Sequence, residues 1–210
     1  MNGTLILARH HESQWNKLGK WTGIQNPSLT DYGKEKSADM GYIIENIPVD
    51  YAFTSMQVRS IETLSCMLGV CTTKEVPTTH AQQLNERDYG DYTGKNKWEM
   101  KELVGEDEWN AIRRGWDHPV PGGETLKMVY ERAVPFYQKE IAPKVIAGET
   151  VLVVAHGNSL RALTKYIESL SDEEVEHTEF PFGGLVFYSL DEQGKMKTKE
   201  TKQIDSSVNA

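Results

Sequence analysis

Two short apolar runs in this chain each end in histidine. Residues 5–8 lead into Arg9 and His10, and residues 151–155 lead directly into His156. Continuous apolar runs of this length are typical of strands buried on both faces, as in parallel sheets. Ligands of open α/β sheets bind at the carboxyl ends of such strands. Both histidines are therefore expected at one rim of the sheet.

Further along, the chain alternates strands with segments of helical character. Residues 51–53 and 185–188 predict two more strands, the second followed by a turn at the sheet edge. Helices are expected over residues 30–45, 56–68, 97–114 and 125–146, the last bent near Pro135 and Pro143, with a break over residues 117–123. This alternation predicts an α/β fold, a three-layer sandwich with a mainly parallel central sheet.

Chain length favours one domain. The 210 residues are enough for a single well-packed α/β unit, which we expect over residues 1–194. The remainder, residues 195–210, is expected to be a loose polar C-terminal tail, because it contains Lys195, Lys197, Lys199 and Lys202 and few apolar positions.

The formal net charge of −8 and a pI near 5.3 argue against nucleic acid or an anionic membrane as the main partner. The two cysteines, Cys66 and Cys71, are too few for a disulfide framework and lack companions of metal-site type, so we expect free thiols and no metal. The sequence has no signal peptide and no membrane span, which predicts a cytoplasmic protein. Phosphate loops of the GxxxxGK[ST] and GxGxxG kinds are absent, which disfavours nucleotide hydrolysis and dinucleotide chemistry.

Residues that suit phosphoryl chemistry follow the predicted strands. Arg9 adjoins His10, Arg59 comes shortly after residues 51–53, and Glu86 lies in a loop near Leu84. A phosphoryl group in transfer spreads negative charge over its equatorial oxygens, and planar guanidinium groups match that charge. Two arginines and two histidines are thus candidates to surround one phosphoryl group.

Several motifs together resemble a known family. They are residues 7–16, 22–23, 53–59, 84–97, 113–114 and 155–161, in order and with compatible spacing. The set is similar to the 2,3-bisphosphoglycerate-dependent phosphoglycerate mutases of the histidine phosphatase superfamily, and the similarity runs from Leu5 to about Leu190. The Leu-Asn-Glu-Arg and His-Gly-Asn-Ser-Leu-Arg stretches point to the mutases rather than to the superfamily at large.

The resemblance implies roles for individual residues. His10 is expected to be the nucleophile that carries the phosphoryl group, and Glu86 the acid and base that exchanges a proton with the substrate hydroxyl. Arg9, Arg59 and His156 are expected to clamp the transferring group. The expected substrate-binding residues are Ser13, Asn16, Thr22, Gly23, Arg87, Tyr89, Lys97, Arg113, Arg114, Gly157 and Asn158. The implied primer is 2,3-bisphosphoglycerate, the implied substrates are phosphoglycerates, and a homodimer is one assembly that the resemblance allows.

Two positions depart from the family pattern. His11 stands where the mutases ordinarily have glycine, and it either points away or narrows the site and adds a titrating group. Phe182 stands near a position where the mutases usually carry threonine, and it either alters the site wall or packs in the interior.

Three hypotheses about function follow. The first is a mutase that interconverts 3-phosphoglycerate and 2-phosphoglycerate, favoured by Lys97, Arg113 and Arg114 as contacts to the substrate acid. The second is a hydrolase of the same superfamily, in which water accepts the phosphoryl group. The third is a catalytically impaired relative, for which His11 is the only support.

Overall fold

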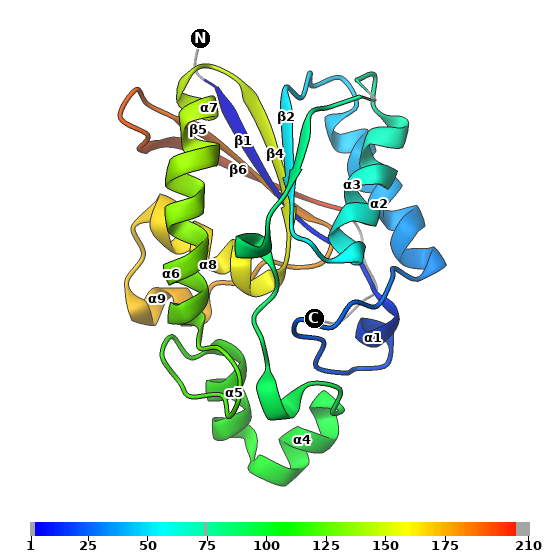
Figure 1. Cartoon of the computed structure of the whole chain (residues 1–210), viewed down its shortest axis with the longest axis vertical. Coiled ribbons are helices and arrows are strands. Elements are labelled where there is room, and N and C mark those ends of the chain that lie inside the picture. The colour runs from blue at the N-terminus through cyan, green and yellow to red at the C-terminus, as the bar shows by residue number, and fades with distance from the viewer. Residues whose placement is uncertain (1–2, 74, 205–210) are drawn as a thin grey trace.

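The computed structural model describes residues 3–73 and 75–204. A six-stranded sheet lies between two layers of helices (Figure 1). Its strands are β1 (Thr4–Arg9), β2 (Tyr51–Thr54), β3 (Thr78–His80), β4 (Thr150–Ala155), β5 (Gly184–Leu190) and β6 (Met196–Gln203). The strand order is β3-β2-β4-β1-β5-β6. The first four of these strands are parallel, and β5 and β6 are antiparallel to their neighbours. The predicted three-layer α/β fold is confirmed.

Alternate residues of β1 face the two helical layers. Leu5 and Leu7 pack in one cluster with residues of α6 and α8, whereas Ile6 and Ala8 pack in the other with residues of α2 and α3. The helices are α1 (Gln14–Lys17), α2 (Asp31–Ile44), α3 (Val58–Val70), α4 (Lys97–Val104), α5 (Glu106–Arg114), α6 (Leu126–Phe136), α7 (Ala142–Ile146), α8 (Gly157–Glu168) and α9 (Asp172–His177). Short 3-10 turns occur at Gln82–Leu84 and Gly90–Tyr92.

Two predicted helices differ from the structure in detail. The segment 97–114 is not one helix, because Gly105 has a φ of +84° and ends α4 before α5 begins. The segment 125–146 is interrupted as predicted, with a π-helical stretch at Tyr137–Ile141 between α6 and α7.

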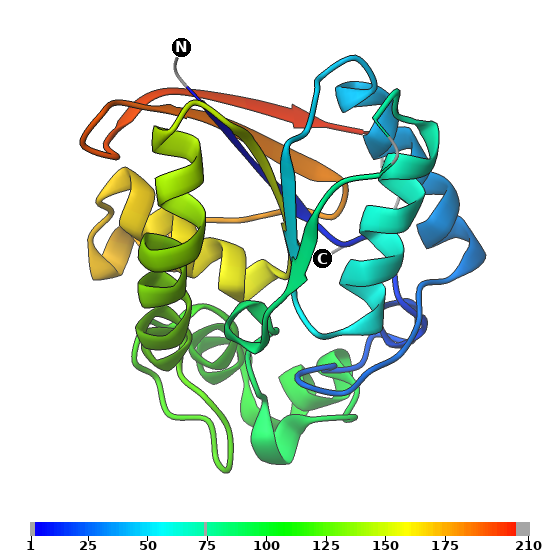
Figure 2. The same cartoon turned by 45° about the horizontal axis from the view of Figure 1, so that its top comes forward.

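The C-terminal part of the chain corrects two expectations. Residues 185–188 do not form an edge strand, because β5 pairs with β1 on one side and with β6 on the other (Figure 2). The loose tail expected from Lys195 is wrong for Met196–Gln203, which form β6. All residues of β6 are exposed and lysines recur along it, which is how natural sheets protect an edge, so its polar sequence looked like a tail. Residues 205–210 lie outside the described residues.

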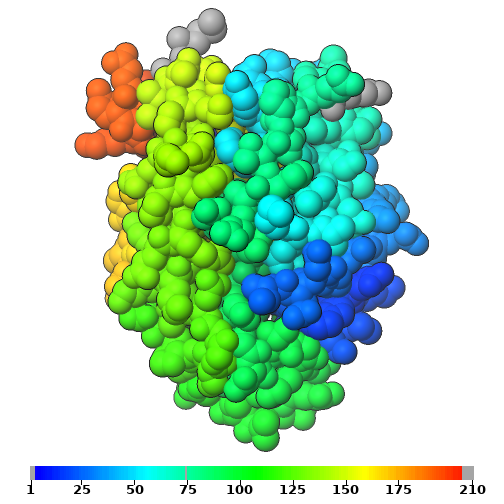
Figure 3. All heavy atoms as spheres, in the orientation of Figure 1, coloured from blue at the N-terminus to red at the C-terminus, as the bar shows by residue number. Residues whose placement is uncertain are grey.

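Helices α4 and α5 lie beyond the carboxyl ends of β1 and β4 (Figure 1). The space-filling view shows this segment, in green, against the segment around α1, in blue (Figure 3). Functional side chains from the strand ends, α1, α4 and α5 can therefore meet at this end of the molecule.

Candidate active site

The two strand-end histidines lie side by side. β1 and β4 are parallel neighbours in a register that pairs Arg9 with Ala155, so the next residue on each strand is a histidine at the same rim. The ring centroids of His10 and His156 are 4.8 Å apart. The expectation that both histidines share one rim is confirmed.

The surroundings of His10 fix which ring nitrogen is free. Its Nδ1 lies 2.7 Å from the backbone oxygen of His11. A carbonyl oxygen only accepts, so Nδ1 carries the hydrogen and Nε2 keeps its lone pair. Burial, followed by the charges of Arg59 and Arg9, holds the pKa of His10 well below its usual range. At neutral pH the ring is therefore an uncharged imidazole with a free Nε2.

His156 is anchored from the side of α3. Its Nε2 lies 2.7 Å from Ser55 Oγ, which in turn lies 2.7 Å from Ser60 Oγ. Burial, then the charges of Arg59 and His10, lowers the pKa of His156 well below its usual range. The opposite ring nitrogen, Nδ1, is buried and has no hydrogen-bond partner within the described residues. A buried polar atom of this kind is available to a ligand.

Glu86 is held by the start of α8. Its side-chain Oε1 accepts hydrogen bonds from the backbone N–H of Asn158 (3.2 Å), from Asn158 Nδ2 (3.1 Å) and from the backbone N–H of Arg87 (2.8 Å). The free N–H groups of a helix N-terminus favour a negative group in this position. Glu86 is 8 % exposed and lines the same pocket as His10.

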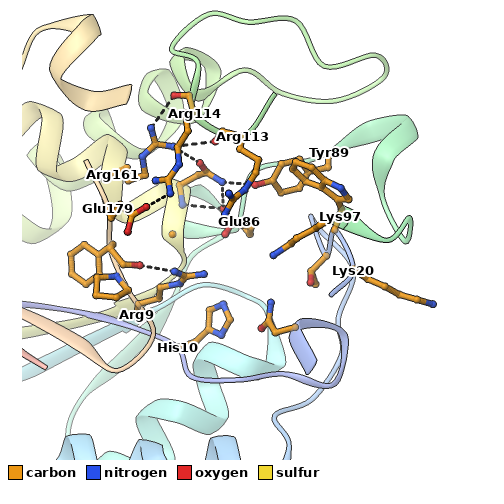
Figure 4. A pocket seen from close by; sticks show the side chains of 17 residues that line it. Arg9, His10, Lys20, Glu86, Tyr89, Lys97, Arg113, Arg114, Arg161 and Glu179 are labelled. Carbon is orange, nitrogen blue, oxygen red and sulfur yellow. Dashed lines mark hydrogen bonds and ion pairs between the residues drawn. The ribbon is translucent and has the colours of Figure 1, made fainter. Parts of the chain in front are cut away.

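The pocket brings together most of the predicted site residues (Figure 4). Those that line it are Arg9, His10, Asn16, Thr22, Glu86, Tyr89, Lys97, Arg113, Arg114, Gly157 and Asn158. Segments from β1, α1, α4, α5 and α8 all contribute. Residues distant in the sequence therefore form one wall around His10.

Positive charge dominates this pocket. Its lining contains six cationic side chains and two carboxylates, in a chain whose formal net charge is −8. Burial, then repulsion from Arg113 and Arg9, lowers the pKa of Lys97 to about 8. Burial likewise lowers the pKa of Arg9 and of Arg161 to about 10. Cations crowded against one another in this way favour binding of a ligand with several negative charges.

Arg59 and Gly23 do not line the pocket. Arg59 is almost fully buried in the first turn of α3, and its guanidinium donates to the backbone oxygens of Gln25 (2.8 Å) and Gly23 (3.1 Å). Gly23 has a φ of +52°, a conformation that glycine adopts without strain. Arg59 thus acts on His10 and His156 through its charge, while Gly23 shapes the loop that holds Arg59.

Ser13, Arg87 and His156 also lie behind the lining residues. Ser13 caps α1, and its hydroxyl donates to Asn16 Oδ1 (2.7 Å). Arg87 is fully buried, donates to the backbone oxygen of Ile112 (2.6 Å), and has its Cζ 4.6 Å from the centre of the Tyr89 ring. The structure does not bring Arg87 to the pocket as a substrate contact, because its guanidinium is turned towards the end of α5.

Some lining residues were missed from the sequence: Lys20, Trp21, Arg161, Glu179, Phe180 and Pro181. Arg161 had a usable signal, because it follows Gly157 by one helical turn, and its Nη1 donates to Asn158 Oδ1 (3.0 Å). Glu179 forms an ion pair with Arg114 (Figure 4). No local pattern predicts that pairing, because the two residues come from different elements.

The two departures from the family pattern are both buried. His11 does not line the pocket, and its ring lies 5.6 Å from that of Tyr32, in an edge-to-face arrangement. Its pKa falls to about 4 through burial and then the charge of Arg9, so it is uncharged at neutral pH. Of the two alternatives, His11 therefore points away from the pocket. Of its two alternatives, Phe182 packs in the interior: it does not line the pocket, and its ring centre lies 3.8 Å from Arg9 Cζ.

Neither a metal-type cluster nor a membrane-spanning helix is found among the described residues. Across residues 3–73 and 75–204, no group of three or more His, Cys, Asp or Glu side chains is arranged to hold a metal ion. In the same part of the chain, no helix is both long and apolar enough to cross a membrane.

Comparison with known proteins points to one superfamily. The sequence profile described as the histidine phosphatase superfamily (branch 1) matches residues 5–201. A 2,3-bisphosphoglycerate-dependent phosphoglycerate mutase from Parvibaculum lavamentivorans is 41 % identical over 202 residues, which cover 95 % of this chain and 96 % of the relative. The protein of the same name from Beijerinckia indica is 38 % identical over 206 residues, which cover 97 % and 100 % of the two chains.

Solved structures agree on the fold. The YhfR protein of Bacillus stearothermophilus superposes with a TM-score of 0.80 at 25 % identity, over 92 % of this chain and 94 % of that one. A mycobacterial glucosyl-3-phosphoglycerate phosphatase superposes with a TM-score of 0.81 at 16 % identity, over 99 % and 100 % of the two chains. The second likeness concerns the fold alone.

Proposed function

Because this chain belongs to the histidine phosphatase superfamily (branch 1), we propose that it is a phosphoglycerate mutase that interconverts 3-phosphoglycerate and 2-phosphoglycerate. One observation carries the proposal beyond the family. The pocket that holds the uncharged His10 also holds Lys97, Arg113 and Arg114, a second group of cations contributed by α4 and α5. A phosphorylated three-carbon acid can place its phosphate beside His10 and Arg9 and its carboxylate beside Lys97, Arg113 and Arg114.

In the proposed first step, His10 Nε2 attacks one phosphorus of 2,3-bisphosphoglycerate. The Nε2–P bond forms and the bond between phosphorus and the ester oxygen of the glycerate breaks. That oxygen takes a proton from Glu86. The resulting phosphohistidine ring carries positive charge, which the backbone oxygen of His11 stabilises at Nδ1. Arg9 and His156 are next to the ring and would stabilise the charge on the transferring oxygens.

In the second step the free hydroxyl of 3-phosphoglycerate attacks the phosphohistidine and 2,3-bisphosphoglycerate forms. Glu86 takes the hydroxyl proton, the new O–P bond forms, and the Nε2–P bond breaks, so that His10 returns as the uncharged imidazole. Transfer of the other phosphoryl group of 2,3-bisphosphoglycerate to His10, as in the first step, then releases 2-phosphoglycerate. One carboxyl group thus serves as acid and then as base. Its anchoring by the start of α8 keeps it beside the reacting oxygen in both steps.

We also propose 2,3-bisphosphoglycerate as the primer, which supplies the phosphoryl group that first loads His10. The pocket suits such a molecule, because Arg9, Lys97, Arg113 and Arg161 are crowded together with pKa values lowered first by burial. A cytoplasmic location follows from this proposal, since glycolytic substrates are found there. A single domain, and assembly into a homodimer, stay predictions.

A coupled assay with 3-phosphoglycerate tests the proposed function. We expect 2-phosphoglycerate to form, faster when 2,3-bisphosphoglycerate is added. Incubation with the primer should also leave an acid-labile, base-stable phosphoryl adduct on His10 that is lost in His10→Ala. An adduct on His156 or His11 would contradict the assignment, and release of inorganic phosphate in place of 2-phosphoglycerate would favour a hydrolase.

Glu86→Gln tests the proton carrier. The amide keeps the shape of the side chain but cannot exchange a proton, so turnover should fall by about two to four orders of magnitude while substrate affinity changes little. Glu99→Gln, an exposed carboxylate in the first turn of α4, is a matched control and should keep its turnover. Normal turnover in Glu86→Gln would assign the proton transfer to another group.

A further inference from the structure

Phe182 contacts two of the proposed reacting groups. It lies in the loop between α9 and β5 and is 2 % exposed. Its ring centre is 3.8 Å from Arg9 Cζ, the distance of a guanidinium stacked on an aromatic face. The same ring lies 5.8 Å from the His10 ring in an edge-to-face arrangement. One side chain therefore borders both the nucleophile and its neighbouring cation.

Arg9 has few other contacts that fix its guanidinium. Its Nη1 donates to the backbone oxygen of Phe180 (2.6 Å), whereas its Nε has no hydrogen-bond partner within the described residues. A Cβ added to Gly157 would lie 3.5 Å from Arg9 Cζ, so the start of α8 also bounds the group. The aromatic face thus fixes the plane of the guanidinium while leaving N–H groups for a ligand.

His11 supports Phe182 from the far side. The His11 ring lies 6.0 Å from Phe182 and 5.6 Å from Tyr32, and its Nδ1 accepts a hydrogen bond from the backbone N–H of Glu12 (2.8 Å). Tyr32, His11 and Phe182 form a row of neighbouring aromatic rings that leads from α2 to Arg9. The two positions at which the chain departs from the family pattern are therefore in contact and belong to one unit.

We propose that Phe182 is a positioning residue for phosphoryl transfer, whose ring face holds the Arg9 guanidinium and whose ring also borders His10, with His11 as its support. The inference rests on the proposed function, because it concerns the same transfer to His10. A cation over a ring is attracted by the negative charge of the π face, and the attraction is larger when water is excluded, as it is here. An aliphatic side chain of similar size would fill the space without this attraction.

Fluorinated phenylalanines at position 182 test the proposal, because they keep the shape of the ring while withdrawing charge from its face. The measurement is the single-turnover rate of His10 phosphorylation by 2,3-bisphosphoglycerate. With one, three and five fluorines, this rate should fall stepwise, to a total loss of about threefold to thirtyfold. The dissociation constant of the primer should change less than the rate.

The same series at Phe187 is the matched control. Phe187 is buried in β5, belongs to the same core cluster as Ile6, and has Lys202 Nζ 5.2 Å from its ring centre. It does not line the pocket. Its fluorination should leave the rate of His10 phosphorylation unchanged. Equal losses at positions 182 and 187 would overturn the inference, because they would reflect a general effect of fluorine on the fold.

Two further outcomes separate this inference from the proposed function. If the native chain forms no phosphohistidine, the proposed function fails. If phosphohistidine forms at a rate that fluorination of Phe182 does not alter, the proposed function stands and the positioning role is overturned. Phe182→Leu completes the test: a loss of rate in this variant, without a stepwise loss in the fluorinated series, would show that Phe182 acts through shape alone.

Discussion

The pocket has two unlike regions: the rim, formed by His10, Glu86 and His156, and the arm, formed by α4 and α5. The two rim histidines are at most 2 % exposed and are fixed by the register of two neighbouring strands. The arm presents Lys97, Arg113 and Arg114 from helices that meet at Gly105. In its ion pair, the side chains of Arg114 and Glu179 are 26 % and 60 % exposed.

This difference in burial suits the rim to the reaction and the arm to ligand binding. A buried rim keeps the nucleophile uncharged and its geometry fixed, which suits a reaction that depends on positioning. A partly exposed arm can adjust its cations to the ligand. Two buried guanidiniums join the regions: Arg87 donates to the backbone oxygen of Ile112 (2.6 Å), and Arg161 to that of Arg114 (2.9 Å). Both bind the carboxyl end of α5, where cations are favourable.

A change at the rim should mainly affect turnover. In His156→Ala, one preorganised group beside the transferring phosphoryl is lost, so kcat should fall about a hundredfold or more while KM changes little. Steady-state kinetics with 3-phosphoglycerate measures both. The exposed His80→Ala on β3 is the control and should behave as the native protein. A large rise in KM at constant kcat would show that His156 binds the substrate and does not stabilise the transferring phosphoryl group.

A change at the arm should mainly affect substrate capture. Burial and the charges of Arg113 and Arg9, partly offset by Glu86, set the pKa of Lys97 at about 8. Lys97 is charged below this value and loses its charge above it, so kcat/KM should fall about tenfold between pH 7 and pH 9. In Lys97→Arg the charge persists, and the fall should be less than twofold. An equal decline in both proteins would assign the titration to another group.

The ion pair on the arm should have a smaller effect. The Glu179 carboxylate forms an ion pair with the Arg114 guanidinium, so it competes with the carboxylate of the substrate for that group. An ion pair with this much solvent exposure contributes little stability. Glu179→Gln should therefore lower KM about twofold to threefold at unchanged kcat. Glu173→Gln on α9 makes the same change in net charge away from the pocket and should leave KM unchanged. If both variants lower KM alike, long-range charge explains the effect.

The rim was predictable from the sequence and the arm only in part. Buried parallel strands carry a strong local signal, and their carboxyl ends converge by topology, so the apolar runs before His10 and His156 were sufficient. The orientation of Arg59 and Arg87 depends on backbone oxygens supplied by other segments, which no spacing reveals. The same holds for Glu179, which reaches Arg114 only through the packing of α9 near α5. Strand β6 was missed because its exposed, lysine-rich sequence has no buried face.

His11 follows His10 of the rim and packs on the side of α2, and it does not line the pocket. Since its ring is packed against Tyr32 and Phe182, His11→Gly should not raise the rate of phosphoryl transfer, and should lower the free energy of unfolding by about 1 to 3 kcal/mol at pH 7.

The pKa of about 4 for His11 makes this stability difference depend on pH. The unfolded chain protonates His11 below about pH 6.5 whereas the folded chain does not, so the native protein loses stability as pH falls from about 6.5 towards 4. The variant lacks this loss, so the stability gap should narrow by about 2 kcal/mol between pH 7 and pH 5, as measured by urea unfolding. A gap that stays constant would show that the fold does not hold His11 uncharged, and faster transfer in the variant would show that His11 narrows the site.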